Sequence, residues 1–250
     1  MSYTRRLSIL AFLTLMAIES FAQDDSFVLE LEVGSSWQSN NDVQIPNDQT
    51  ADRFDLTDIL GSGPWASFRL NGIWNINERH GLRVVLAPLT IEERGQFDTN
   101  VRFDGESFLA ATPLDARYRF NSWRLGYRYQ YYDNNGWRLW AGATAKLRDA
   151  EITLLQGDTR ASDDDLGFVP LLHLAGEYRW SDRWHFEFDF DGLAGGPGRA
   201  IDLSLKVGYT LDENWRITAG YRGLEGGADT DDVYSFAWFN SALVSAQYRF

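Results

Sequence analysis

The chain has 250 residues, of which 24% are charged and 15% aromatic, and its formal net charge is −13 at pH 7. Such an acidic chain lacks the basic footprint of nucleic-acid-binding proteins, so composition argues against a nucleic-acid partner. The sequence contains no cysteine, which excludes disulfides and thiol chemistry.

The N-terminal segment has the pattern of a secretory signal peptide. Arg5 and Arg6 precede a continuous apolar run, and a small-x-small cleavage motif ends at Ala22. The apolar run is shorter than the roughly 20 residues that a membrane-spanning helix needs. We therefore expect a signal peptide over residues 1–22 and a single mature domain over residues 23–250.

Short polar turns alternate with longer segments rich in Gly, Asp and Asn along the rest of the chain. Three of the short turns lead into Trp137, Trp184 and Trp215, and tryptophan is enriched at membrane interfaces. The four short turns contain residues 78–80, 133–135, 181–183 and 212–214. The longer segments lie at about 39–63, 92–113, 156–165, 192–199 and 225–231. This alternation predicts ten strands, at about 26–38, 65–77, 81–91, 114–132, 136–155, 166–180, 184–191, 200–211, 215–224 and 232–250.

Two of the longer segments carry structure of their own. In the first, apolar residues between 54 and 60 interleave with Asp55 and Asp58, which favours a short helix that either caps the mouth or packs on neighbouring loops. In the second, Asp104-Gly105 separates two short apolar runs and predicts a hairpin turn. Counting that hairpin as part of the main sheet gives twelve strands as the alternative.

The final strand alternates between apolar and polar residues. Tyr248 and Phe250 belong to the mostly apolar face, while Gln247 and Arg249 belong to the polar face. The terminal phenylalanine, the signal peptide and the strand plan together resemble those of bacterial outer-membrane β-barrel proteins. This resemblance implies an all-β, antiparallel up-and-down transmembrane barrel whose short turns face the periplasm.

The same resemblance implies where the protein resides and what it meets there. Tyr248 and Phe250 would be the membrane assembly signal read by the barrel-assembly machinery. The expected location is the cell outer membrane, with lipid and lipopolysaccharide as partners and a monomer as the expected state. We predict no cofactor and no metal site, since the acidic runs near residues 163–165 and 229–232 lack the spacing of a calcium-binding loop.

The alternation also predicts which charges lie inside the barrel. Arg or Lys facing lipid at the bilayer midplane costs about 2–4 kcal/mol, so the charged face of each strand lines the lumen. Glu30, Glu32 and Asp191 fall on this face. The predicted lumen charge network comprises Arg69, Arg83, Arg124, Arg128, Arg138, Lys146, Glu177, Arg179, His185, Glu187, Asp189, Asp202, Lys206, Arg216, Arg222 and Arg249.

A short stretch of the two longest predicted strands departs from this pattern. Tyr118, Phe120 and Ile152 fall on the inward face, whereas Asp149 and Glu151 fall outward. A β-bulge here would reverse the facing beyond it, and these strands are where we expect one. Without a bulge, the inversion is tolerable only above the membrane.

Three functions are consistent with a basic, carboxylate-lined lumen. The first is a structural or surface-interaction barrel whose lumen is closed by arginine–carboxylate pairs. The second is a narrow channel that favours anions. The third is a lipid- or peptide-directed hydrolase, in which His173 lies opposite Asp191 and would serve as a general base. Such a pair also needs a nucleophile or a positioned water, which the sequence alone does not place beside it, and His80 is expected in a solvated turn.

Overall fold

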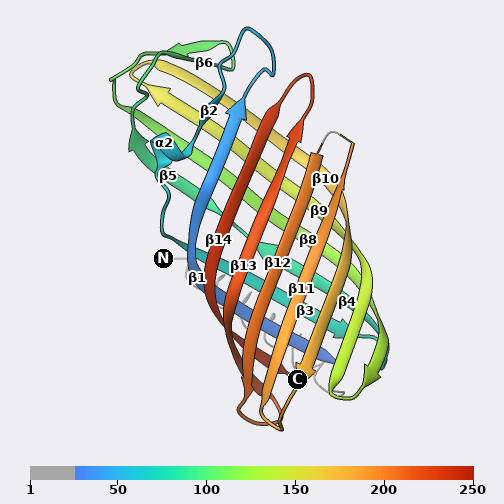
Figure 1. Cartoon of the computed structure of the whole chain (residues 1–250). Coiled ribbons are helices and arrows are strands. Elements are labelled where there is room, and N and C mark those ends of the chain that lie inside the picture. Colours follow the sequence, from blue (N-terminus) through green and yellow to red (C-terminus); the bar gives the residue numbers. More distant parts are fainter. Residues whose placement is uncertain (1–25, 197) are drawn as a thin grey trace, which may run out of the picture.

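A computed structural model describes residues 26–196 and 198–250, so the predicted signal peptide lies outside the described residues. Ten antiparallel strands form a barrel (Figure 1), which closes where β1 pairs with β14. This confirms the ten-stranded up-and-down barrel. The strands of the ring are β1 (Phe27–Gln44), β3 (Trp65–Asn75), β4 (His80–Ala87), β8 (Leu114–Asn134), β9 (Trp137–Gln156), β10 (Thr159–Arg179), β11 (Trp184–Gly195), β12 (Gly198–Thr210), β13 (Trp215–Asp229) and β14 (Tyr234–Arg249).

The shorter elements belong to the two longest connections. The first connection holds β2 (Phe54–Asp55) and the helix α2 (Thr57–Leu60), close to the predicted position. The second holds β5 (Thr90–Gly95), which runs beside β8, and the hairpin of β6 (Val101–Phe103) and β7 (Glu106–Phe108). This hairpin forms a separate two-stranded sheet, so the ring contains ten strands and not twelve. No helix among the described residues is long and apolar enough to cross a membrane.

The two ends of the barrel differ in the length of their connections. The four predicted short turns lie at one end, together with residues 27 and 250, whose backbones are hydrogen-bonded. We call this the turn end and the opposite end the loop end. Three connections at the loop end are shorter than predicted, because β9, β11 and β13 continue as far as Gln156, Gly195 and Asp229 and pair there with the next strand. The acidic run 163–165 therefore lies on strand β10 and not in a loop.

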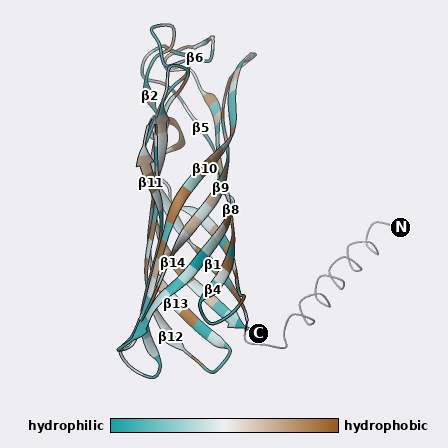
Figure 2. Cartoon of the chain, turned by 90° about the vertical axis from the view of Figure 1, so that its right-hand side faces the viewer, coloured by the Kyte–Doolittle hydropathy of each residue, from teal (hydrophilic) through white to brown (hydrophobic). Residues whose placement is uncertain are grey.

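The outer surface of the barrel is apolar along its middle, and brown and teal segments alternate along the strands in Figure 2. Each outward side chain is followed by an inward one, as the period of a strand requires. Aromatic rings cluster at the turn end, where Trp215 lies 4.8 Å from Tyr248 and Trp184 lies 5.0 Å from Tyr209 between ring centroids. The exposed apolar side chains of the middle include Leu31, Phe68, Val84, Leu125, Leu147, Phe168, Leu172, Leu174, Leu205, Ile217 and Val244.

Toward the loop end the barrel reverses its polarity. Tyr118 and Ile152 face inward and are buried, while Arg119 on the outer surface pairs with Asp149 at 3.0 Å and Glu151 at 2.6 Å. This facing is as predicted, but it needs no bulge at that point. The register shifts lie elsewhere, between Gln38 and Asn40 of β1 and between Gln130 and Tyr132 of β8. The strands extend beyond the apolar outer surface, and there the apolar residues turn inward.

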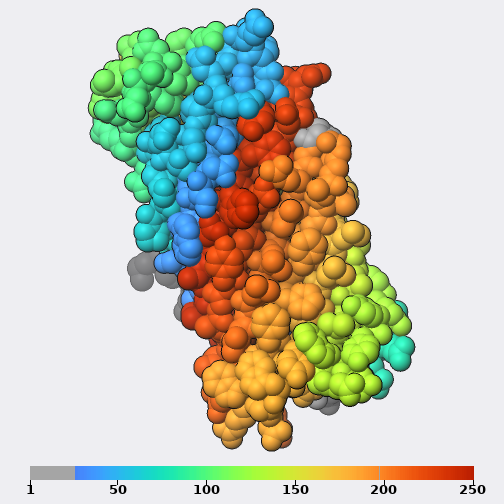
Figure 3. Space-filling view, viewed as in Figure 1, coloured from blue at the N-terminus to red at the C-terminus, as the bar shows by residue number. Residues whose placement is uncertain are grey.

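The inward apolar residues form a compact core with the two long connections. Phe103 and Phe108 of the hairpin, and Leu56 before α2, are fully buried in this core. Figure 3 shows the light-blue and green segments of these connections packed together at the loop end. Arg102 donates to Asp52 at 2.7 Å, and this hydrogen bond holds the pKa of Asp52 below its usual range. This hydrogen bond joins the first long connection, which contains Asp52, to the second, which contains Arg102.

Candidate functional site

Polar side chains from nearly every strand meet in the middle of the lumen. Asp202 on β12 accepts hydrogen bonds from Arg69 on β3 at 2.9 Å and from Arg124 on β8 at 2.6 Å. It also accepts one from Arg222 on β13 at 2.5 Å. The same Arg222 donates from Nε and Nη2 to the two oxygens of Glu32 on β1, at 3.0 and 2.9 Å. These five side chains are almost completely buried.

A second carboxylate extends this arrangement across the lumen. Asp191 on β11 accepts from Arg124 at 2.8 Å, from Thr144 on β9 at 2.9 Å and from Arg83 on β4. Arg83 also donates to both oxygens of Asp189, at 2.9 and 3.0 Å. Arg124 therefore joins the two carboxylate centres into one network.

We call these eight charged residues the central plug. It consists of Glu32, Arg69, Arg83, Arg124, Asp189, Asp191, Asp202 and Arg222. Four guanidinium groups face four carboxylates, so the plug carries no excess charge. Forked guanidinium groups satisfy several acceptors at once, and long arginine side chains fill the width of a small barrel.

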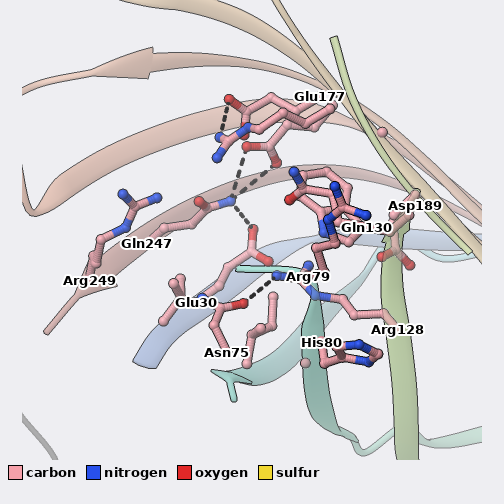
Figure 4. A pocket seen from close by; sticks show the side chains of 18 of the residues that line it. Glu30, Asn75, Arg79, His80, Arg128, Gln130, Glu177, Asp189, Gln247 and Arg249 are labelled. Atoms are coloured by element: carbon pink, nitrogen blue, oxygen red, sulfur yellow. Dashed lines mark hydrogen bonds and ion pairs between the residues drawn. The ribbon is translucent and has the colours of Figure 1, made fainter. Parts of the chain in front are cut away.

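Between the plug and the turn end lies a second group of charges around a cavity of about 620 Å³ (Figure 4). Lys206 contacts Glu30 at 2.6 Å and Glu187 at 3.5 Å. Arg138 and Arg216 contact Glu177 at 2.6 and 3.0 Å. The walls of this cavity are therefore held by their own ion pairs.

Three further arginines of the predicted lumen network lie near the turn end. Arg128 donates to Asn75 at 3.0 Å and lies 4.9 Å from the ring of Trp140. Arg179 is half-exposed at the rim, where its Nε lies 3.5 Å from Glu177. Arg249 lines the cavity, as Figure 4 shows.

Two of the three histidines occupy the positions that the strand register predicts. His173 lies opposite Asp191, with 3.0 Å between Nδ1 and Oδ1, and only 1% of its side chain is exposed. His185 lies opposite Arg179 and contacts Glu187 at 2.9 Å. His80 was expected in a turn, but it is the first residue of β4, directly after the turn, and its Nδ1 lies 2.6 Å from the hydroxyl of Tyr127.

Asp191, the partner of His173, is also engaged by other donors. It accepts from two arginines and a threonine, and neither cavity described in this structure is lined by His173. His173, Asp189 and Asp191 place ligand-type atoms within 4.8 Å of one another. Both carboxylates are neutralised by arginine, so we assign no metal ion to this cluster.

A second cavity, of about 660 Å³, lies on the loop-end side of the plug, and we call it the loop-end cavity. Tyr118, Phe120 and Ile152 line it together with Lys146. Lys146 was predicted within the charge network, but it makes no ion pair with any described residue. Its Nζ lies 4.8 Å from the ring centroid of Phe120.

Comparison with solved structures finds proteins of the outer membrane. The outer membrane protease OmpT from Escherichia coli is similar with a TM-score of 0.56 and 11% identity, over 91% of this chain and 98% of that chain. The translocator domain of the autotransporter NalP from Neisseria meningitidis gives 0.43 and 11% over 99% and 97%, and Ail from Yersinia pestis gives 0.36 and 14% over 90% and 99%. The chain is an outer-membrane-type β-barrel. At 11% identity the likeness to OmpT is one of fold alone. No family model and no curated protein matches the sequence.

Sequence reasoning missed the neutral members of the lumen and the loop-end cavity. Thr144 hydrogen-bonds Asp191, and Ser245 donates to Glu30 at 2.5 Å. The alternation places both side chains inward, and this signal was available. The cavity had no such signal, because it depends on where β10 and β11 cease to pair.

Proposed function

We propose that the protein is a closed, non-conducting outer-membrane barrel with a structural or surface-interaction role. The central plug carries this proposal, because its ion pairs connect opposite walls of the lumen. The plug contains as many guanidinium groups as carboxylates, so among the described residues it presents no excess positive charge to select anions, as an anion channel would need. The buried, fully engaged Asp191 favours a structural role for His173 over a hydrolytic one.

Conductance tests the proposal. We expect the purified full-length protein to give no reproducible current in planar lipid bilayers. The double variant Arg222→Ala/Glu32→Ala removes one guanidinium and its carboxylate, so charge balance is kept while the plug loses two long side chains. This variant is expected to conduct. A matched control is Arg119→Ala/Asp149→Ala, an ion pair on the outer surface, which should stay silent. Steady current through the unaltered protein would contradict the proposal.

We also propose that the mature protein begins near Gln23 and lies in the outer membrane with its turn end in the periplasm. The apolar outer surface and the aromatic cluster at the turn end support this placement. Cell fractionation should recover the protein in the outer membrane, and mass spectrometry should find a chain without residues 1–22. Contact with lipopolysaccharide, a monomeric state and an assembly role for Tyr248 and Phe250 remain proposals. If Phe250 is part of the assembly signal, Phe250→Ala should reduce the amount of protein inserted in the outer membrane.

A further inference from the structure

The barrel wall has an unpaired stretch between β10 and β11. β10 begins at Thr159, but its pairing with β11 stops where Leu172 lies opposite Gly192. Residues 159–171 pair only with β9. Pro170 lies in this edge and has no N–H to donate, as is usual for proline at an unpaired strand edge. We call the gap between this edge and the end of β11 the seam. In Figure 1 the yellow β9–β10 turn lies beside β6, away from the orange strands β11 and β12.

The seam reaches the level of the apolar outer surface. Phe168 of β10 points outward beside Leu147 of β9, and their side chains are 65% and 47% exposed. The charged outer surface begins further along the pair, where Asp149 lies opposite Leu166. Unpaired backbone in hydrocarbon is costly and occurs only where it is covered or lines a cavity. The seam therefore requires something to cover it or fill it.

A comparable gap elsewhere in the wall is filled by the protein itself. β3 pairs with β4 only from Leu70 onward, and β5 pairs with β8 alone. Helix α2 lies in this gap, so close that a Cβ added at Gly95 would come within 2.7 Å of Ile59. No helix among the described residues occupies the seam. Instead, Val169, Pro170 and Leu193 at its edges line the loop-end cavity.

The loop-end cavity has apolar walls and one buried cation. Its volume of about 660 Å³ falls within the roughly 300–1,000 Å³ of small-molecule sites. Leu193 is 44% exposed although its strand position faces inward with Ala200. Lys146 lies at the bottom, beside Arg124 of the plug, and is 2% exposed. Burying a cation without a partner is costly. An anionic group in the cavity would supply that partner.

Charges at the top of the cavity favour entry through the seam. Asp163, Asp164 and Asp232 line the cavity toward the loop end. Arg148 is already paired with Asp165. These carboxylates repel an anion that approaches from the loop end, whereas the edges of the seam are apolar.

We propose that the seam and the loop-end cavity bind a single-chain amphiphile with an anionic head group. The head group pairs with the Lys146 ammonium. The acyl chain passes between Val169 and Leu193 into the surrounding lipid. This binding needs no open lumen, because the cavity ends at the central plug.

Thiol protection tests the proposal, since the chain has no cysteine of its own. The Val169→Cys variant, folded in a non-ionic detergent, is labelled with a water-soluble maleimide in the presence of dodecanoate or dodecanol. Dodecanoate should slow labelling at concentrations where dodecanol does not. Leu174→Cys, outward on the same strand beyond the seam, is the matched control and should label at the same rate with either compound.

Charge variants show whether Lys146 recognises the head group. Adding Lys146→Met should raise the dodecanoate concentration needed for protection by about tenfold to a hundredfold, as expected for the loss of a charge-assisted contact. Lys146→Arg keeps the cation and should keep the protection. Heat-dependent gel mobility verifies that each variant is folded. Equal protection by dodecanol, or protection that survives Lys146→Met in the folded protein, would overturn the proposal, as would no protection at all.

Discussion

Asp202→Ala is expected to lower the free energy of unfolding by about 3–5 kcal/mol, the range seen when one partner of a buried ion pair is removed. The carboxylate accepts hydrogen bonds from Arg69, Arg124 and Arg222, so its loss leaves three buried guanidinium groups short of an acceptor. The urea midpoint of unfolding in detergent micelles, followed by tryptophan fluorescence, measures the effect. Asp202→Asn keeps the side-chain volume and one acceptor oxygen, so its urea midpoint should lie between those of the unaltered protein and Asp202→Ala.

The control for this prediction is Asp149→Ala. Asp149 also pairs with an arginine, at 3.0 Å from Arg119, but on the outer surface where its side chain is 29% exposed. Such pairs contribute about 0–1 kcal/mol. If Asp202→Ala shifts the midpoint no more than Asp149→Ala does, the central plug does not stabilise the barrel.

Phe103→Ala is expected to destabilise the core at the loop end by about 3–5 kcal/mol, as for other buried phenylalanines. Phe103 is fully buried, and its ring lies 5.8 Å from that of Phe54. The core lies at the loop end, beyond the apolar outer surface of the barrel, so the damage should remain local. Trypsin should then cut at Arg53 and Arg102, while the heat-dependent gel mobility of the barrel is retained.

Two further substitutions serve as controls for Phe103→Ala. Phe103→Leu keeps most of the apolar volume and should cost less than about 1.5 kcal/mol. Leu109 directly follows the same hairpin, but its side chain is 58% exposed. Leu109→Ala should therefore leave cleavage by trypsin unchanged. If Phe103→Ala is as resistant to trypsin as Leu109→Ala, the core does not hold the two long connections in place.

The strand plan was largely predictable because the alternation of side chains is a local signal. The turn before Trp184 placed His173 opposite Asp191, and the structure has that pair at 3.0 Å. The hairpin around Asp104 and Gly105 was predictable for the same reason, since both residues adopt the positive φ that such a turn requires. Three connections at the loop end are shorter than predicted, because Gly and Asp residues that are typical of loops belong there to paired strands.

The pairing of individual charges was not predictable. Arg124 and Lys146 are neighbours on adjacent strands and both face inward, yet Arg124 contacts two carboxylates while Lys146 contacts none among residues 26–196 and 198–250. Which carboxylates an inward arginine reaches depends on strands across the lumen. The distance between strands on opposite sides of the lumen is set by the closure of the barrel and not by neighbours in the sequence.

The sequence by itself determined the ten strands, the turn end and the facing of each side chain, since these follow from a period of two residues and from short turns. The tertiary structure decided the central plug, the loop-end cavity and the seam. The plug needs side chains from opposite walls of a closed barrel. The seam exists because β10 extends well beyond the last residue of β11 with which it pairs, and where two strands diverge is a property of the whole sheet.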